Sequence, residues 1–183
     1  MVTVDGFGVP VEVAGPEKGS VVVVLGAAHQ APAAYDPVCQ RLHTASLRTV
    51  VIGPDPRLTG KSVVGILDSL DVRWALLVGD RLGGELAWEL AATRLDRFIG
   101  LVAVDRGHPR VADPAGVIRD EHCPPVELNT TVLVSTKAAR AMAVASQRFV
   151  YGEYRIVDLL GRRNAADSTA QLATEIVMRT STW

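Results

Sequence analysis

Charged, amide and imidazole side chains follow the short apolar runs of this chain, and they are the groups that could bind a ligand or do chemistry. His29 and Gln30 follow one run, Asp80 and Arg81 follow another, and Asp105 follows a third. An imidazole titrates near neutral pH and can exchange protons with a substrate. A guanidinium can bind a carboxylate or phosphate through two parallel hydrogen bonds. These positions therefore indicate either acid-base catalysis or anion binding.

Three residues are candidates for catalysis: His29, Asp105 and His108. If either imidazole lies against Asp105, the carboxylate would orient the ring and raise its basicity. The alternative is that each is an ordinary loop histidine. The three residues come from two loops without the spacing of a metal motif, so we predict no metal site and no cofactor.

Ligand binding has its own set of candidates, centred on Arg81. This residue lies at the predicted start of a helix over 83–93, where free N–H groups and the helix dipole favour an anion. We predict a site for a small molecule, with an anion as one candidate, formed by His29, Gln30, Asp80, Arg81, Leu82, Arg106 and Arg163. The alternative is that Arg81 pairs with Asp80, Asp105 or Glu85 and fills a vacated site, because charged networks also serve structure.

Six short apolar runs predict the strands that position these groups. Continuous apolar runs are typical of strands covered on both faces, as in a parallel sheet. The runs lie at 20–26, 48–53, 74–79, 98–105, 131–135 and 154–158. Helical patterns lie between and after them, at about 33–45, 61–70, 83–93, 137–150 and 167–179. This alternation predicts an α/β fold in which right-handed crossovers place helices on both faces of the sheet.

The remaining segments complete a three-layer, doubly wound arrangement of about eight mostly parallel strands. Residues 2–13 alternate apolar and polar side chains around Gly6-Phe7-Gly8, which predicts an exposed antiparallel hairpin. The longest irregular stretch is 105–130, where four prolines interrupt any helix and predict a loop over the site. We expect residues 1–183 to form a single domain whose ligand crevice lies at the carboxyl ends of the strands.

Composition and charge exclude several classes of protein. The chain has 183 residues, of which 48% are hydrophobic, and its 19 Lys and Arg balance 20 Asp and Glu to leave a formal charge of −1. This balance provides no basic stripe for nucleic acid. The apolar runs fall far short of the ~20 residues that a membrane helix requires. The N-terminus does not look like a signal peptide, and the two cysteines lack metal or redox spacing, so we expect a cytoplasmic protein.

The order of elements, with the segment Leu77-Val-Gly79-Asp80-Arg81-Leu82-Gly83-Gly84 opening a predicted helix, resembles the α/β-hydrolase fold family. The resemblance covers nearly the whole chain. In that family a G-x-S-x-G motif holds the nucleophile on a sharp, strained strand-to-helix turn. Here the glycine spacing is kept at Gly79 and Gly83, but Arg81 stands at the nucleophile position. A guanidinium is essentially always protonated and cannot attack a carbonyl.

The other positions that the resemblance implies for a catalytic triad also depart from the family pattern. The acid would follow the strand at 131–134, where Ser135-Thr136-Lys137 offers no carboxylate, or the preceding strand, at Asp105. The histidine would lie near Gly161-Arg-Arg-Asn164, which contains none. Gly26-Ala-Ala-His29 replaces the His-Gly turn before the oxyanion helix, and the short loop at 105–130 implies a minimal lid. Asp80 as a nucleophile would be one residue early, which should turn it away.

The sequence leaves three functions open. The first is a noncatalytic or atypical α/β-hydrolase-fold protein, a pseudo-hydrolase, that binds a small ligand at the carboxyl edge of the sheet. The second is an atypical hydrolase of an ester, amide or lactone, in which Asp105 with His108 or His29 activates a water. The third is a homodimeric interaction protein, whose reduced lid leaves apolar surface for a second copy.

Overall fold

The computed structural model describes residues 1–159 and 165–181 and has an α/β fold built on a seven-stranded sheet. The strand order is β1-β3-β2-β4-β5-β6-β7. Strand β1 is antiparallel to β3, and the other neighbouring pairs are parallel. The mostly parallel sheet predicted from the sequence is thus confirmed. The strands are β1 (Val11–Ala14), β2 (Val21–Leu25), β3 (Arg48–Ile52), β4 (Ala75–Asp80), β5 (Phe98–Val104), β6 (Thr130–Val134) and β7 (Tyr154–Asp158).

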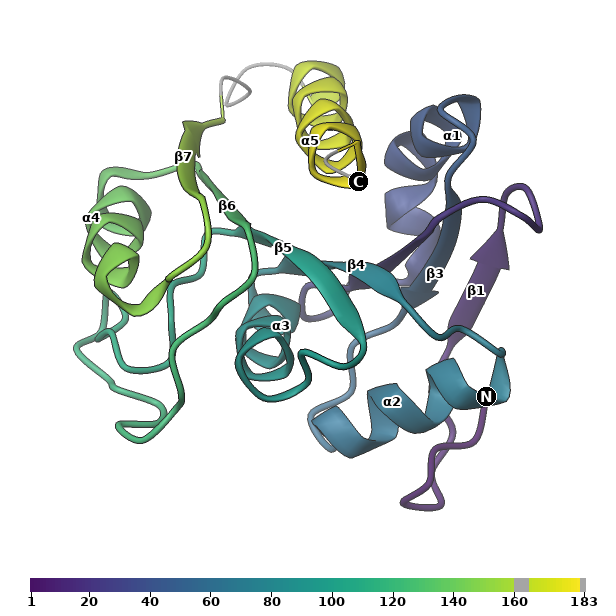
Figure 1. Ribbon diagram of the computed structural model, residues 1–183, viewed down its shortest axis with the longest axis horizontal. Coiled ribbons are helices and arrows are strands. Elements are labelled where there is room, and N and C mark those ends of the chain that lie inside the picture. Colours follow the sequence, from purple (N-terminus) through teal and green to yellow (C-terminus); the bar gives the residue numbers. More distant parts are fainter. Residues whose placement is uncertain (160–164, 182–183) are drawn as a thin grey trace.

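Helices cover both faces of the twisted sheet, which gives the predicted three layers (Figure 1). Helices α1 (Asp36–Thr44) and α5 (Ala165–Thr180) lie on one face. Helices α2 (Gly60–Ser69), α3 (Leu82–Thr93) and α4 (Lys137–Ser146) pack on the other. Short 3₁₀ helices, η1 (Pro32–Tyr35) and η2 (Gln147–Phe149), precede α1 and follow α4. The break before α1 has a local cause, because Pro37 has no N–H to bond the carbonyl four residues earlier.

The central strands bury side chains on both faces, as their continuous apolar sequences predict. Val23, Leu77 and Leu101 belong to the core beneath α2, α3 and α4. Their neighbours in sequence, including Val22 and Leu76, belong to the core beneath α1 and α5. Burial of each such side chain contributes about 1.5–3 kcal/mol. Among the described residues, no helix is both long enough and apolar enough to cross a membrane.

The N-terminal segment forms a shorter hairpin than predicted: the N–H groups of Thr3 and Val9 donate to the carbonyl oxygens of Phe7 and Met1, at 2.9 and 2.8 Å. Val2 and Gly8 form one isolated bridge, and the residues between them make a turn in which Gly6 has a φ of 85°. Strand β1 pairs with β3 instead of with the residues that precede it. Pairing with β3 satisfies the backbone groups along that strand's open edge. The described sheet therefore has seven strands and not about eight.

The loop between β5 and β6 is irregular, as its prolines predict. Residues 105–129 contain turns and one isolated bridge, between Val126 and Val150, but no helix. Asp113 orders one turn by accepting hydrogen bonds from the backbone N–H groups of Ala115 and Val117, at 2.8 and 2.9 Å. The loop leaves β5 at the carboxyl edge of the sheet, where the predicted site residues also lie.

Candidate ligand-binding site

A sharp turn joins β4 to α3 and places Arg81 at its vertex. Arg81 has φ 47° and ψ −102°, a backbone conformation that residues other than glycine rarely adopt. Small residues let the strand and helix approach each other: a Cβ added at Gly79 would lie 2.5 Å from the Cβ of Ala87. A Cβ at Gly83 would overlap the carbonyl oxygen of Leu25. The glycine spacing seen in the sequence is therefore required by this turn.

The guanidinium of Arg81 lies between two carboxylates. Its Nη1 is 3.3 Å from Oδ1 of Asp80, and its Nε is 4.0 Å from Oδ2 of Asp105. The side chain of Arg81 remains 54% exposed, whereas those of Asp80 and Asp105 are 12% and 13% exposed. Of the three predicted partners of Arg81, Asp80 makes the close contact. The pair neutralises charge but leaves Arg81 at the surface.

Asp80 is tied to a residue that the sequence analysis did not select. The Tyr35 hydroxyl donates to Oδ2 of Asp80 at 2.8 Å and accepts from the N–H of Ala27, also at 2.8 Å. Burial raises the pKa of Asp80, although Arg81 and the Tyr35 hydroxyl partly offset this effect. Burial, with the nearby charge of Asp80, also raises the pKa of Tyr35. Tyr35 therefore stays protonated and links the end of β2 to the end of β4.

Asp105 bonds to Ser135 and to no histidine of the described chain. Its carboxylate accepts from the N–H of Ser135 at 2.7 Å and from the Ser135 hydroxyl at 2.5 Å. Asp105 also has a positive φ of 51°. These bonds hold the end of β5 to the end of β6, which is a structural role that the sequence did not reveal.

Within the described structure, neither His29 nor His108 forms a hydrogen bond with Asp105. His108 is buried, its Nδ1 accepts from the N–H of Arg110, and its Nε2 lies 2.9 Å from the carbonyl oxygen of Pro124. The Nε2 atom therefore carries the proton, and the neutral ring stacks on Phe149. Burial lowers the pKa of His108, which also favours the neutral ring. His29 is exposed, has φ 62°, and makes no hydrogen bond within the described residues.

Arg81 and Arg106, two of the arginines predicted to converge, point to different sides. The Nε of Arg106 donates to the backbone oxygen of Arg81 at 3.1 Å, but its Nη2 faces Glu85, 3.0 Å away. Because Glu85 is on α3, this guanidinium lies on the α3 side of the sheet, away from Asp80. Leu82 also faces that side. Arg163 lies outside the described residues.

Arg81 borders an open cavity of about 460 Å³ between η1, α1 and α5, which we call the Arg81 cavity. Gln30, Asp80 and Arg81, three of the residues predicted from the sequence as candidates for ligand binding, line it. Polar side chains from four other positions and an apolar strip complete the described lining: Ala34, Tyr35, Val38, Val104, Ser135, Leu159, Ser168, Thr169 and Leu172. Tyr35, Ser168 and Leu172 could not be foreseen, because nothing local marks residues that reach the cavity from helices far apart in sequence.

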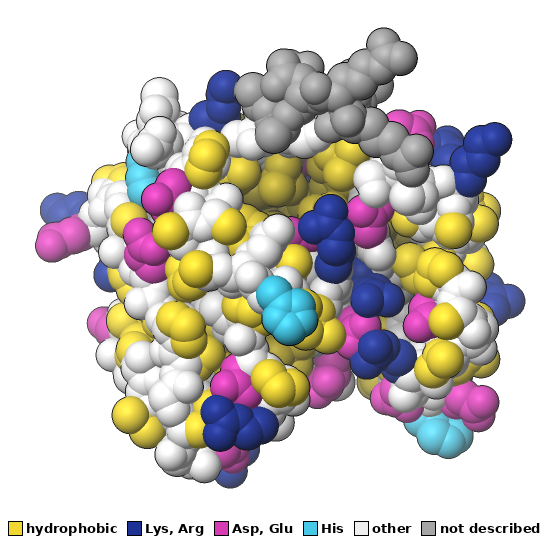
Figure 2. Space-filling model, turned by 180° about the vertical axis from the view of Figure 1, so that it is seen from behind, with side chains coloured by type: hydrophobic (Ala, Val, Ile, Leu, Met, Phe, Trp, Pro, Cys, Tyr) yellow, Lys and Arg dark blue, Asp and Glu magenta, His cyan; other side chains and the backbone are white. Residues whose placement is uncertain are grey.

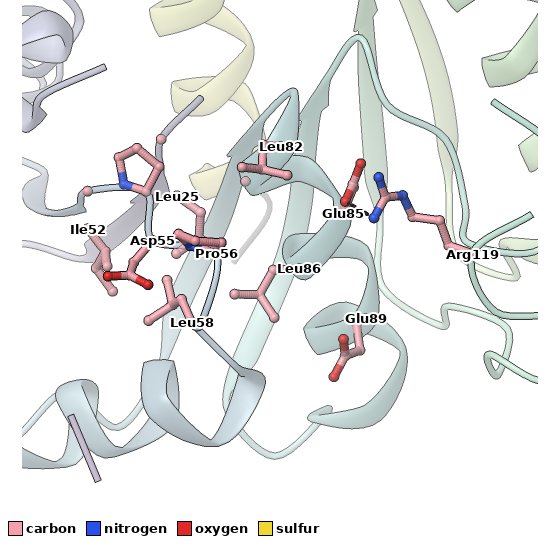
Figure 3. Close-up of a pocket in the computed structure, with 14 residues that line it drawn as sticks. Leu25, Ile52, Asp55, Pro56, Leu58, Leu82, Glu85, Leu86, Glu89 and Arg119 are labelled. Carbon is pink, nitrogen blue, oxygen red and sulfur yellow. Dashed lines mark ion pairs between the residues drawn. The ribbon is translucent and has the colours of Figure 1, made fainter. Parts of the chain in front are cut away.

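A second cavity of about 390 Å³ lies on the α3 side of the turn, and we call it the Glu85 cavity (Figure 3). Leu58, Leu82 and Leu86 give it an apolar wall. At its rim the guanidinium of Arg119 points to Glu85, with Nη1 2.5 Å from Oε2. Arg106 lies close to the other oxygen of Glu85, though not with hydrogen-bond geometry. The charges near this rim are thus already paired with each other.

On the face shown in Figure 2, dark blue and magenta side chains are interspersed along the middle of the molecule, so this face carries no large patch of one sign. Among the described residues, no group of three or more His, Cys, Asp or Glu side chains could hold a metal ion.

Comparison with solved structures identifies the architecture. A hydrolase from Pseudomonas aeruginosa has TM-score 0.73 at 16% identity, and the match covers 98% of this chain and 95% of the other. An α/β hydrolase from Sphaerobacter thermophilus has TM-score 0.73 at 15% identity, with 99% of each chain covered. A mutant epoxide hydrolase of Vigna radiata has TM-score 0.74 at 10% identity, with 100% and 98% covered.

These likenesses show that the chain has the α/β-hydrolase fold. The identities are too low to carry over an activity, since one fold supports many functions. No protein-family model and no curated protein sequence matches the chain.

Proposed function

We propose that this protein is a noncatalytic member of the α/β-hydrolase fold that binds a small polar ligand in the Arg81 cavity. The observation that carries the proposal is the backbone of Arg81, at φ 47° and ψ −102° on the turn between β4 and α3. Hydrolases of this fold hold their nucleophile on such a strained turn. The turn is present here, but its vertex is a guanidinium, which cannot act as a nucleophile.

The histidines support the noncatalytic proposal. Acyl transfer by a serine hydrolase requires a base within hydrogen-bond reach of the nucleophile. The chain has four histidines, and within the described structure none of them forms a hydrogen bond or ion pair with Asp80, Arg81 or Asp105. His43 bonds Thr49, and His108 is held by the backbone of its own loop.

The bond between Tyr35 and Ala27 argues in the same direction. In this fold one oxyanion donor comes from a backbone N–H in the loop that follows the strand equivalent to β2. Here the N–H of Ala27 already bonds the Tyr35 hydroxyl, which in turn donates to Asp80. An oxyanion would have to displace Tyr35 and disturb a buried carboxylate.

The Arg81 cavity supports ligand binding by its size and lining. Small-molecule sites are typically clefts of about 300–1,000 Å³ with a mostly apolar wall and a few convergent polar groups. The Arg81 cavity has a volume of about 460 Å³ and sets Asp80, Arg81 and Gln30 against apolar residues of α1 and α5. It lies at the carboxyl ends of the strands, where ligands bind in open α/β sheets.

A hydrolysis assay tests the absence of catalysis. We expect the protein to hydrolyse neither p-nitrophenyl acetate nor styrene oxide faster than buffer alone does. The matched control for variants of Arg81 is Arg57→Ala, which removes an exposed arginine outside the Arg81 cavity. We also expect the Arg81→Ser variant to remain inactive, because no histidine of the described residues bonds a group at that position. Turnover by the wild-type protein, or efficient turnover by Arg81→Ser, would overturn the proposal.

A screen of small molecules tests the binding. Ligand-detected NMR with a mixed library of neutral, anionic and cationic fragments should find binders whose signals are lost in the Arg81→Ala variant. The Arg57→Ala variant should retain them. A library without any Arg81-dependent binder would count against a ligand site in this cavity.

A further inference from the structure

We infer that the ligand of the Arg81 cavity is a neutral polyhydroxylated molecule, a sugar or a cyclitol, recognised by the adjacent Asp80 carboxylate and Arg81 guanidinium. This inference rests on the proposed function and names the ligand class of the same site. It goes beyond the expectation of an anion that Arg81 alone suggests.

Asp80 provides a buried acceptor with unused capacity. A carboxylate has about four lone-pair sites. Within the described structure, Asp80 accepts one good hydrogen bond, from Tyr35 at 2.8 Å, and two long contacts from Arg81, at 3.3 and 3.5 Å. A buried carboxylate with so few donors is costly unless a ligand or water supplies others. Because Asp80 lines the cavity, a ligand there gains by donating hydrogen bonds to it.

The charges around the cavity disfavour an ionic ligand. Asp80 and Asp105 both lie within 4.0 Å of the Arg81 guanidinium, so an anion that reached Arg81 would also meet two carboxylates. A cation that reached Asp80 would meet Arg81, 3.3 Å from the same carboxylate. Like charges at such distances repel, most strongly where water is excluded. A neutral molecule incurs neither cost.

A hydroxyl group fits this pair because it both donates and accepts. One hydroxyl can donate to Asp80 while its neighbour on the same molecule accepts from Arg81, whose guanidinium has five N–H donors. The Ser135 hydroxyl already donates to Asp105, which leaves its oxygen free to accept from a ligand. Gln30 adds a side-chain amide that makes no hydrogen bond within the described residues.

Part of the cavity lining is apolar and suits the carbon face of such a molecule. Val38, Leu159 and Leu172 come from α1, from the residue after β7 and from α5, and they line the cavity together. A ring with hydroxyls at its edge and C–H groups on its faces would place its edge on Asp80 and Arg81. Its face would then cover this apolar wall.

The test uses four probes of different charge with the full-length protein. Calorimetric titration and saturation-transfer NMR are carried out with myo-inositol, methyl β-D-glucopyranoside, sodium benzoate and butylammonium chloride. We expect at least one of the two neutral polyols to bind and the two ions to bind at least tenfold more weakly. Asp80→Asn should weaken polyol binding about 10- to 100-fold, because hydrogen bonds to a charged acceptor are stronger than those to a neutral amide.

One control variant and one second test variant complete the experiment. Asp55→Asn removes a carboxylate at the Glu85 cavity, outside the proposed site, and should leave polyol binding unchanged. Gln30→Ala truncates an exposed side chain of the Arg81 cavity, and it should weaken binding several-fold even if Asp80→Asn fails to fold.

Binding of benzoate or butylammonium in preference to both polyols would overturn the ligand class while leaving the proposed binding function intact. Polyol binding that Asp80→Asn and Gln30→Ala leave unchanged would also overturn it, because the contact would then lie elsewhere. If none of the four probes binds, the polyol inference fails. The proposed function fails separately if the mixed library also yields no Arg81-dependent binder.

Discussion

The strained turn at Arg81 predicts that glycine is better than alanine at this position. Arg81 has φ 47° and ψ −102°, and a residue held in such a sparsely populated region costs of order 1–3 kcal/mol. Alanine keeps that cost, whereas glycine adopts the conformation without a Cβ clash. Both replacements lose the same contact between Arg81 and Asp80, so the difference between them isolates the backbone.

The magnitude follows from two opposing terms. Relief of strain favours Arg81→Gly by about 1–3 kcal/mol. The greater freedom of glycine in the unfolded chain opposes it by roughly 0.5–1 kcal/mol. We therefore expect the free energy of unfolding of Arg81→Gly to exceed that of Arg81→Ala by about 1 kcal/mol.

Urea denaturation of the two variants measures this difference. The fluorescence of the tryptophans, which include the buried Trp88, reports unfolding, and the midpoints are compared at a common slope. The matched pair Gln40→Ala and Gln40→Gly, at an exposed position inside α1, should show the opposite sign, with glycine about 1 kcal/mol less stable. If Arg81→Gly is no more stable than Arg81→Ala, the turn is not strained and the reasoning is wrong.

Three other predictions follow from the same contacts. Gly83→Ala should lower the free energy of unfolding by about 1–3 kcal/mol, because its Cβ would overlap the carbonyl oxygen of Leu25. A loss below about 1 kcal/mol in urea denaturation would contradict this. Burial raises the pKa of Asp80, so the folded state binds the carboxyl proton more tightly than the unfolded state does. The contribution of Asp80 to the free energy of unfolding is therefore lost as pH rises from about 4 towards neutrality. Asp80→Asn should therefore gain stability relative to wild type between pH ~4 and ~7, and a difference that stays constant over this range would refute the assignment. Burial raises the pKa of Cys123 to about 11 and also raises the pKa of Cys39. Ellman's reagent should therefore label neither thiol in the native protein but both in denaturant. Rapid labelling of the native protein would contradict this prediction.

Local sequence determined the elements and the turn that joins β4 to α3. Continuous apolar runs fixed the buried strands, since their alternate side chains must be covered on both faces. The spacing of Gly79 and Gly83 resembles that of a strained strand-to-helix turn, and the Cβ overlaps at both positions explain why this turn needs glycine there. The N-terminal hairpin is shorter than predicted because alternation indicates a strand but not its partner, and β1 pairs with the edge of β3.

Only the tertiary structure decided which strand-end residues meet. Tyr35 and Asp80 are joined because β2 and β4 are neighbours in the sheet, and nothing in the intervening sequence encodes that bond. Asp105 and His108 are three positions apart, yet one bonds Ser135 and the other is buried against Phe149. Arg81 and Arg106 likewise face opposite sides of the sheet. The sequence specifies side-chain chemistry and local conformation, whereas the direction and the contacts of each side chain depend on strand order and register.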